Sequence, residues 1–411
     1  MTTPFRAVCA LIALVFVAAC ASAPLGRAGE RPLTVLISID GFRPDYLDRG
    51  VTPTLSKLAA EGVRGEMRPS FPSKTFPNHY ALVTGLRPDR NGIVDNNMYD
   101  PAISPQEFTM SARPVNSDPR WWNQAEPIWV TAEKAGVRTA TMFWPGSDVA
   151  IRGVLPSRWK LFDVKLPAEA RVDQALAWLD GPWAKRPRLL TLYFDDVDTA
   201  GHEFGPDTPG LNAAAAKVDA AIGRLVAGLA ARAIVANIVV VADHGMAALS
   251  PERRIFADDL VPIAEVKTVT MGPFMSLYPL PGHEAEVAKA LLQPHAHMQC
   301  WRKGEIPARY HYGRNPRVPP LFCLAQTGWS ITTHDAKPKK TEWGNHGFDP
   351  FDPTMAAVFI AHGPAFHRGA RLESFDNVDV YPLLARLLGV VPRANDGTLA
   401  ELAPALAPSA P

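Results

Sequence analysis

Hydrophobic runs of strand length, separated by segments of helical composition, recur along this chain and constrain its fold. The runs at residues 33–39, 189–194 and 234–241 are largely apolar, which is typical of strands that are covered on both faces. Further elements are predicted from the same periodicities: strands at 140–144 and 356–361, and helices at 52–61, 212–231 and 380–388. This alternation predicts an α/β fold with a doubly wound, mostly parallel sheet and helices on both faces.

The sequence changes character between residues 261 and 340. Short alternating runs at 266–269 and 274–278, one predicted helix at 284–292 and many prolines replace the long apolar strands. We therefore predict a small α+β insertion at 261–340, within a catalytic domain made of residues 31–260 and 341–400. An Ala/Pro-rich tail follows at 401–411. A chain of 411 residues with 47% hydrophobic content is long enough for such a domain and insertion.

Residues 1–23 have the features of an export leader. Arg6 precedes an apolar stretch, residues 7–19, that is too short to span a bilayer. The sequence Val17-Ala18-Ala19-Cys20 is similar to a bacterial lipoprotein box, which would place a lipid on Cys20, whereas Ala21-Ser22-Ala23 fits ordinary signal cleavage. We predict an exported protein, periplasmic or lipid-anchored to the outer membrane, whose only membrane contact is an anchor at Cys20.

The body of the chain contains one pair of cysteines, Cys300 and Cys323. In an oxidising compartment such a pair favours a disulfide, and we predict that bond. Two buried, reduced cysteines are the alternative.

Side chains that can bind metal follow the predicted strands. Asp40 comes directly after the first strand, Asp243-His244 after the strand at 234–241, and an expected loop at 195–202 after the strand at 189–194. Open α/β sheets place their sites at the carboxyl ends of strands. The full set has three carboxylates and three imidazoles: Asp40, Asp198, His202, Asp243, His244 and His346. Each residue alone fits a turn or a core histidine, but together they favour two mixed nitrogen and oxygen sites, suited to zinc.

Thr75 stands directly before Phe76-Pro77 and an apolar run. Proline is well tolerated in the first turn of a helix, so Thr75 is predicted at a helix start, where free N–H groups and the positive dipole end favour an anion. For an isolated threonine the ordinary interpretation is a helix N-cap. The metal-binding residues elsewhere favour a nucleophile instead.

Several segments in order along the chain strongly resemble the nucleotide pyrophosphatase/phosphodiesterase family of the alkaline phosphatase superfamily. They include Lys74-Thr75-Phe76-Pro77-Asn78-His79, Asp198-x-x-Gly201-His202, Ala242-Asp243-His244-Gly245-Met246 and Gly344-Asn345-His346-Gly347. The strand that ends in Asp40-Gly41 and the segment Asn377-Val378-Asp379 match as well. The resemblance is to a bacterial, exported member.

The resemblance implies two zinc ions per chain. One would be held by four residues, which are Asp40, Thr75, Asp243 and His244. The other would be held by Asp198, His202 and His346. Two such metals clamp the attacking and leaving oxygens of a phosphoryl transfer.

The resemblance also implies the roles of the remaining site residues. Thr75, its hydroxyl pKa lowered by the first metal, would attack phosphorus to form a phospho-threonine, which water activated by the second metal would hydrolyse. The N–H of Phe76 and the amide of Asn96 would hold the non-bridging oxygens, and Phe76 would also line a nucleoside pocket. Tyr193, and more distantly Trp159, are aromatic candidates from the residues themselves, although core packing is their ordinary role.

We therefore predict a two-zinc phosphodiesterase that releases nucleoside 5′-monophosphates from small phosphodiester or phosphoanhydride substrates. One alternative is a phosphomonoesterase, for which Arg152 or Lys160 would supply extra cations. Another is a non-enzymatic, zinc-stabilised exported binding protein. A net charge of +1 argues against a nucleic-acid-binding surface, and no sequence feature indicates an obligate protein partner.

Overall fold

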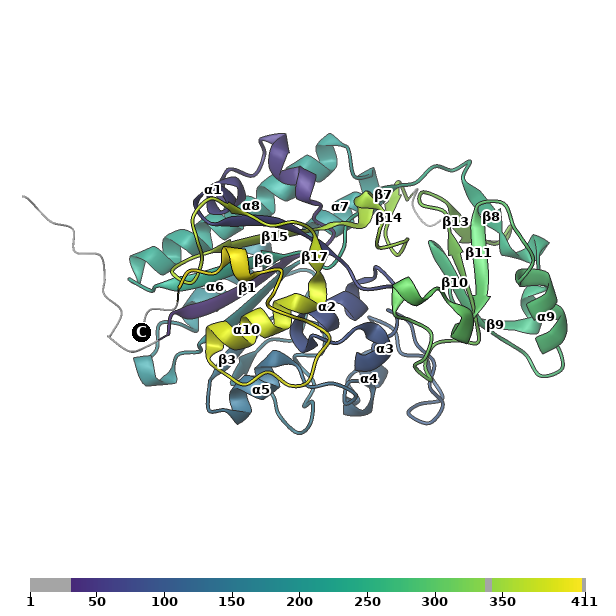
Figure 1. Cartoon of the computed structure of the whole chain (residues 1–411), viewed down its shortest axis with the longest axis horizontal. Helices are drawn as coiled ribbons and strands as arrows, with labels where there is room; N and C mark the ends of the chain where they lie inside the picture. The colour runs from purple at the N-terminus through teal and green to yellow at the C-terminus, as the bar shows by residue number, and fades with distance from the viewer. Residues whose placement is uncertain (1–30, 337–341, 409–411) are drawn as a thin grey trace, which may run out of the picture.

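The computed structural model describes residues 31–336 and 342–408. The predicted leader, with Cys20, lies outside these residues, as do 337–341 and the last residues of the tail. The molecule has a large α/β body and a smaller lobe beside it, at the right of Figure 1. Within the described ranges, none of the helices has the length and apolar character needed to cross a membrane.

The body is built on one nine-stranded sheet. Its main order is β16-β2-β15-β6-β1-β5-β3-β4, and β17 pairs with β2. The strand bounds are β1 Leu33–Ile39, β2 Val63–Arg68, β3 Thr139–Met142, β4 Arg158–Trp159, β5 Leu189–Phe194, β6 Ala236–Val241, β15 Ala357–His362, β16 Ala370–Arg371 and β17 Phe375–Asp376. Neighbouring strands are parallel except for β15, which runs antiparallel to both β2 and β6. The predicted α/β fold with a mostly parallel sheet is confirmed.

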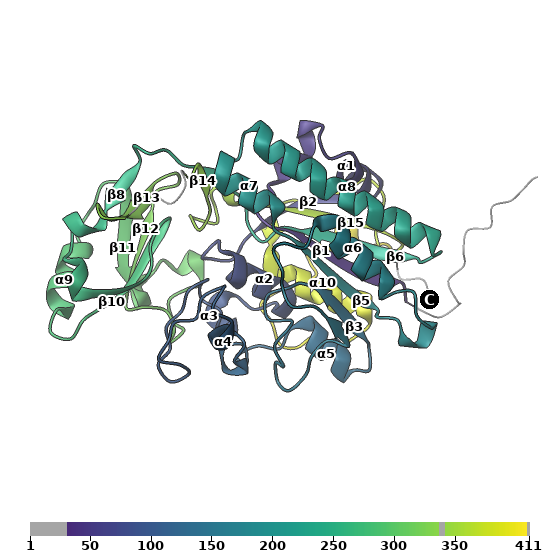
Figure 2. The same ribbon diagram turned by 180° about the vertical axis from the view of Figure 1, so that it is seen from behind.

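The centre of this sheet is fully covered. Every residue of β1 and of β5 is buried, as the apolar runs predicted. On one face lie α1 Pro53–Glu61, α6 Ala168–Ala177, α7 Asp196–Phe204 and α8 Pro209–Ala231, seen in front in Figure 2. The other face is covered by α2 Thr75–Thr84, α5 Ile128–Lys134 and α10 Val380–Leu388, seen in Figure 1. The short helix α3 Pro88–Asn91 packs against α2, and α4 Arg113–Asn116 lies beyond it.

The smaller lobe is formed largely by the predicted insertion. An antiparallel sheet of order β11-β12-β10-β9 and the helix α9 form a second apolar core. The bounds are β9 Val266–Thr270, β10 Phe274–Pro279, α9 Glu284–Leu291, β11 Met298–Arg302 and β12 Leu321–Ala325. Two short two-stranded sheets accompany it. One pairs β8 Arg254–Phe256 with β13 Ser330–Thr332 inside this lobe, and the other pairs β7 Ala247–Ala248 with β14 Gly344–Asn345 between the lobe and the body. The division of the chain into domains at 261 and 340 stays a prediction.

Cys300 and Cys323 form the predicted disulfide. The two residues lie directly opposite each other on β11 and β12. The bond therefore joins two neighbouring strands of the insertion sheet.

Two local predictions were wrong. The segment 195–202, expected as a loop, is mostly the helix α7, which begins at Asp196. Its glycine, Gly201, lies inside the helix, where an alanine-sized side chain would press against Met246. The strand expected at 140–144 ends at Met142, because Phe143 has a φ of 62° and cannot continue an extended strand.

Candidate functional site

The predicted metal-binding residues meet at one edge of the sheet, together with the start of α2. Asp40 directly follows β1, and Asp243-His244 follows β6. Asp198 and His202 stand four residues apart on α7, so they share one face of that helix. His346 comes from the chain after β14.

Thr75 is the first residue of α2, as predicted, and the capping position belongs to Lys74. Thr75 is 7% exposed, and its side chain caps no N–H of the helix. Its Oγ1 instead lies 3.4 Å from His244 Nε2. The hydroxyl thus faces the candidate metal ligands, in place of the ordinary role of a threonine at a helix start.

The first predicted ligand set converges on His244 Nε2. This atom lies 3.4 Å from Asp40 Oδ1 and 2.8 Å from Asp243 Oδ2, in addition to its contact with Thr75. The imidazole and both carboxylates are buried. All four residues therefore present a nitrogen or oxygen atom to one small volume.

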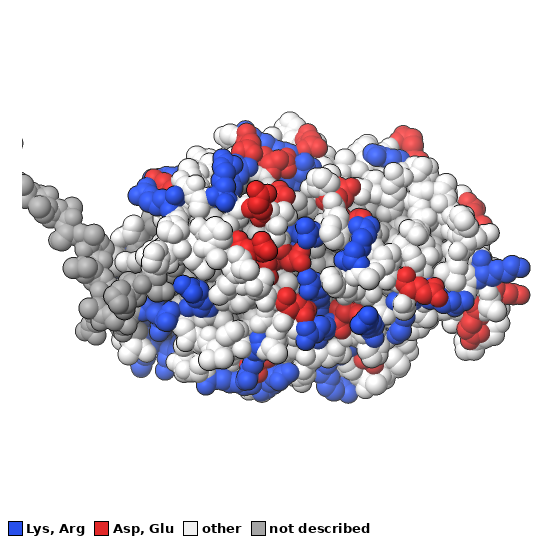
Figure 3. Space-filling view, viewed as in Figure 1, with Lys and Arg blue, Asp and Glu red and all other residues white. Residues whose placement is uncertain are grey.

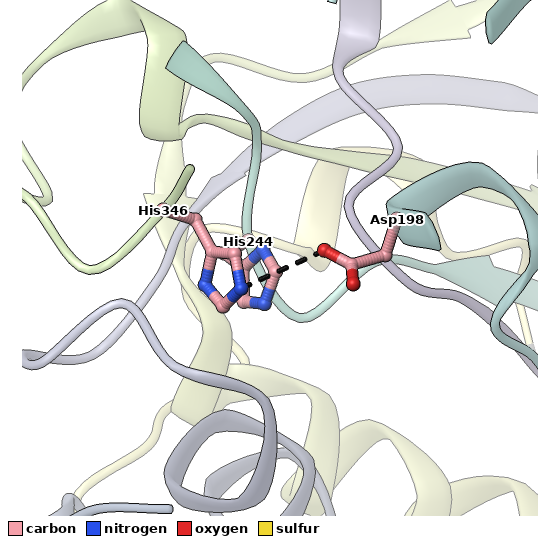
Figure 4. A group of neighbouring side chains, drawn as sticks. All are labelled: Asp198, His244 and His346. Atoms are coloured by element: carbon pink, nitrogen blue, oxygen red, sulfur yellow. Dashed lines mark ion pairs between the residues drawn. The ribbon is translucent and has the colours of Figure 1, made fainter. Parts of the chain in front are cut away.

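The second predicted set converges on the carboxylate of Asp198. Asp198 Oδ2 lies 3.4 Å from His202 Nε2, and Asp198 Oδ1 lies 3.6 Å from His346 Nε2, the contact drawn in Figure 4. The rings of His244 and His346 are stacked with centroids 3.5 Å apart. The two sets are therefore adjacent.

Each of the three histidines is oriented through its other ring nitrogen. The Nδ1 atom of His244 lies 2.9 Å from the Gly245 carbonyl oxygen. The Nδ1 atom of His202 lies 2.8 Å from the Gly344 carbonyl oxygen, and that of His346 lies 2.9 Å from the Ser73 carbonyl oxygen. A carbonyl only accepts, so Nδ1 carries a proton, and in the neutral form of each ring the lone pair is then on Nε2, where it can bind a metal. Burial, with a contribution from the adjacent His244, lowers the pKa of His346 well below its usual value, which keeps this ring neutral.

The carboxylates also fit metal ligands. Among the described residues, Asp40 Oδ1, Asp198 Oδ1 and Asp243 Oδ2 are buried without a hydrogen-bond partner. Burial raises the pKa of Asp40 well above its usual value, and the carboxylates of Asp243 and Asp198 raise it further. Buried carboxylates that repel one another are costly unless a cation lies between them. These oxygens and the three Nε2 atoms are a donor set that suits zinc.

His79 is a site residue that the sequence analysis missed. Its Nδ1 lies 2.9 Å from the Thr75 carbonyl oxygen and 3.5 Å from Asp243 Oδ2, and its Nε2 lies 2.8 Å from Ser38 Oγ. Asp40, His79 and Asp243 form one group with metal-binding spacing, and Asp198, His244 and His346 form another. This grouping places His244 with the second predicted set. The signal in the sequence was the four-residue step from Thr75, which puts His79 one turn later.

The two predicted oxyanion donors are bonded to each other. The N–H of Phe76 donates to Asn96 Oδ1 over 2.8 Å. This hydrogen bond directs the amide so that Nδ2 is its remaining donor. Asn96 is 8% exposed and lies beside the start of α2.

An apolar cavity of about 450 Å³ opens beside Thr75. Charged side chains in its wall include Arg113, which is paired with Asp148. Aromatic side chains form much of the remaining wall: Phe76, Trp122, Phe143, Trp144, Phe162 and Tyr193. Tyr193 also donates its hydroxyl to Asp40 Oδ2 over 2.6 Å, so it links the cavity to the first ligand set. Trp159, which was also expected here, lies 40% exposed on the edge strand β4 and does not line the cavity. Phe162, three residues later, takes that place.

The two cations considered for a monoesterase differ in position. Lys160 lines the cavity, whereas Arg152 does not and has its Nη1 4.0 Å from Glu126 Oε2.

On the face shown in Figure 3, basic and acidic side chains are interspersed.

The family model described as type I phosphodiesterase / nucleotide pyrophosphatase matches residues 34–349. An uncharacterized pyrophosphatase/phosphodiesterase of Schizosaccharomyces pombe is 38% identical over 386 residues, which cover 89% of this chain and 78% of that protein. Ectonucleotide pyrophosphatase/phosphodiesterase family member 1 of Mus musculus is 37% identical over 387 residues, which cover 91% of this chain. This chain spans only 42% of that longer relative.

A solved structure shows the same architecture. It is murine ectonucleotide pyrophosphatase / phosphodiesterase 5, as an inactive threonine-to-alanine variant in complex with AMP. The TM-score is 0.87 and the sequence identity 32%, with coverage of 92% of this chain and 100% of that chain. This chain therefore belongs to the type I phosphodiesterase/nucleotide pyrophosphatase family, within the alkaline phosphatase superfamily.

Proposed function

We propose that this chain is a two-zinc phosphodiesterase/nucleotide pyrophosphatase that releases nucleoside 5′-monophosphates through a phospho-threonine intermediate. The observation that carries the proposal is the place of Thr75. Its hydroxyl is buried at the start of α2 and lies 3.4 Å from His244 Nε2, at the point where the candidate ligands converge. A purely structural zinc site is closed by its protein ligands and has no need of a threonine.

Both predicted ligand sets are retained in the proposal. Asp40, Asp243, His244 and Thr75 would hold one zinc ion. Asp198, His202 and His346 would hold the other. When bound, the two ions supply positive charge that lowers the pKa of the Thr75 hydroxyl and offsets the charge on the phosphoryl oxygens.

The chain's own residues perform the displacement in this proposal. Thr75 Oγ1 loses its proton and attacks phosphorus, the bond from phosphorus to the leaving oxygen breaks, and that oxygen departs with a proton. The phospho-threonine still carries the nucleoside. Water then cleaves the bond between phosphorus and Thr75 Oγ1, which releases the nucleoside 5′-monophosphate and restores the hydroxyl. Substrate would take the Phe76 N–H away from Asn96 Oδ1, so that this N–H and the Asn96 amide both donate to non-bridging oxygens. The murine relative that is inactive with alanine in place of a threonine supports a threonine in this role.

The cavity favours a nucleotide diester. Thr75 and Phe76 lie in its wall together with other aromatic side chains. Its volume of about 450 Å³ is enough for a flat organic group. Stacking of a base on an aromatic side chain contributes about 1–3 kcal/mol. The relative's complex with AMP supports a nucleoside monophosphate as the product.

A phosphomonoesterase is the second candidate, because Lys160 lies in the wall of the same cavity. A monoester has an additional charged oxygen, which a lysine can neutralise. We place it second because the rest of the wall is mostly apolar.

The test is a comparison of kcat/KM for a nucleoside 5′-monophosphate aryl ester and for the simple aryl phosphate. We expect the diester to be the better substrate of the wild-type protein. A preference for the monoester would reverse the order of the two candidates and make Lys160→Ala the next variant. Absence of turnover of either ester by zinc-loaded protein would leave the non-enzymatic binding protein as the remaining interpretation.

We also propose that the protein acts outside the cytoplasm. Support comes from the leader pattern at residues 1–23 and from the relatives named as ectonucleotide enzymes. Mass spectrometry of the mature amino terminus tests the two leader predictions, because lipid on Cys20 and cleavage after Ala23 give different masses.

A further inference from the structure

The loop that carries Asn96 has no regular structure of its own. Residues 94–97 belong to neither a helix nor a strand, so side-chain contacts hold them in place. The Asn96 amide meets the N–H of Phe76, the residue after Thr75. Any displacement of the loop therefore moves a donor that we assign to the reaction.

Asp95 is the residue that fixes this loop from inside. It is 4% exposed, and its Oδ1 accepts the N–H of Asn96 over 2.6 Å. A side-chain carboxylate that accepts a neighbouring backbone N–H holds the local chain in one conformation.

The other carboxylate oxygen is bound by the insertion. Thr270, the last residue of β9, donates its hydroxyl to Asp95 Oδ2 over 2.5 Å, and Asn97 Nδ2 lies 3.5 Å from the same hydroxyl oxygen. Tyr312, also from the insertion, donates its hydroxyl to the Val94 carbonyl oxygen over 3.0 Å. The loop is thus attached to the smaller lobe at two points.

These contacts are shielded from water. Thr270 is 7% exposed and Tyr312 is 6% exposed. A hydrogen bond to a buried charged group is stronger than one at the surface, and its loss leaves the group unsatisfied. The charged or titratable groups that face Asp95 are Lys74, which directly precedes α2, and Tyr312.

We propose that Asp95 is a positioning residue for Asn96, and that the insertion sets the catalytic amide through the hydroxyl of Thr270. The proposal rests on the function assigned to Asn96 above. Asp95 itself does not touch substrate, and it acts by holding the backbone of the loop. The insertion then has a part in catalysis as well as in the shape of the molecule.

The test is Thr270→Val, which removes the hydroxyl and keeps the shape of the side chain. The matched control is Thr268→Val on the same strand, because the buried Thr268 hydroxyl has no hydrogen-bond partner among the described residues. Thr270→Ser restores a hydroxyl. The readouts are kcat and KM for the nucleoside aryl ester, zinc content and the melting temperature.

We expect Thr270→Val to lower kcat roughly tenfold with KM changed less than about twofold, because the misplaced donor acts mainly in the transition state. Thr270→Ser should recover most of that loss, and Thr268→Val should behave as wild type. Wild type and the three variants should contain the same number of zinc ions per chain.

A second readout separates positioning from a general loss of stability. Burial raises the pKa of Asp95 to about 6, and the Thr270 hydrogen bond opposes that rise. Without the hydroxyl the pKa is higher still, so the acid limb of the kcat profile should move to higher pH in Thr270→Val and stay in place in Thr268→Val.

The outcomes are distinct. In one outcome wild type turns over the diester, and Thr270→Val and Thr268→Val have equal kcat values and equal pH profiles. That result would overturn the positioning role and leave the proposed function intact. No turnover of the diester by zinc-loaded wild type would overturn both.

Discussion

Replacing Tyr193 by phenylalanine removes a single oxygen atom from the site and keeps the ring. The hydroxyl donates to Asp40 Oδ2 over 2.6 Å from a side chain that is 9% exposed. A hydrogen bond to a buried charged group contributes about 1.5–3 kcal/mol, which corresponds to a factor of roughly 10–150 in an equilibrium constant. Loss of a partner that orients a metal ligand commonly lowers metal affinity about 10–100-fold. We therefore expect Tyr193→Phe to bind zinc at the first set about 10–100-fold more weakly.

The assay is zinc retention against increasing concentrations of a chelator, followed by elemental analysis. Kinetics at saturating zinc provide a second measurement. The ring that lines the cavity is unchanged, so KM for the nucleoside aryl ester should stay within about twofold of wild type. Tyr46→Phe is the matched control, because the buried Tyr46 hydroxyl has no hydrogen-bond partner among the described residues.

Two results would refute this reasoning. One is a zinc retention curve for Tyr193→Phe that overlays that of wild type, which would mean that the hydroxyl does not stabilise Asp40 as a ligand. The other is an equal loss of zinc in Tyr46→Phe, which would assign the effect to general destabilisation. A large rise in the KM of Tyr193→Phe at saturating zinc would instead show that the hydroxyl acts mainly by contacting the substrate.

Three further predictions follow from single contacts. Phe76→Ala should reduce the preference for the diester over the monoester by about 1–3 kcal/mol, mainly by lowering kcat/KM for the diester; an unchanged ratio would exclude base stacking on this ring. Glu342→Gln should lower the zinc affinity of the second set about tenfold, because Glu342 Oε1 lies 2.9 Å from His202 Nδ1 and helps to orient that ring. The loss is limited because the Gly344 carbonyl remains as a partner of the same nitrogen. Equal zinc affinities of Glu342→Gln and wild type in chelator competition would argue against this role. Replacing both Cys300 and Cys323 by serine should lower the free energy of unfolding by about 2–4 kcal/mol, given their separation of 23 residues, and denaturant curves that match oxidised wild type would contradict this.

The sheet, and the placing of the candidate ligand residues at one edge of it, were predictable because both depend on local sequence patterns. An apolar run buried on both faces identifies β1 and β5, and a carboxylate after such a strand falls at the carboxyl edge of the sheet. The direction of β15 was not predictable in this way. A buried strand has the same composition in either direction, and only its pairing with β6 and β2 sets it antiparallel.

Contacts between distant segments account for most of what the sequence analysis missed. The Tyr193 hydroxyl reaches Asp40 across 153 positions, and Glu342 reaches His202 across 140. No periodicity encodes such pairs. Trp159 was the aromatic candidate named in this segment, and Phe162, which follows β4 and was not named, lies in the cavity wall instead.

The helix α7 was missed for a different reason. The segment 195–202 has three aspartates among its first four residues and contains a glycine, a composition that favours turns. Acidic residues are also favourable in the first turn of a helix, and Asp196 and Asp198 lie there. The packing of Gly201 against Met246 explains why a residue with low helix propensity is accommodated.

The most direct test of the central claim is the turnover and zinc content of Thr75→Ala, measured on the same purified sample. The account predicts that kcat for the nucleoside aryl ester falls by several orders of magnitude while about two equivalents of zinc remain bound, since three other residues still hold the first ion and Thr75 takes no part in holding the second. Turnover close to that of wild type, with zinc in place, would contradict a threonine nucleophile.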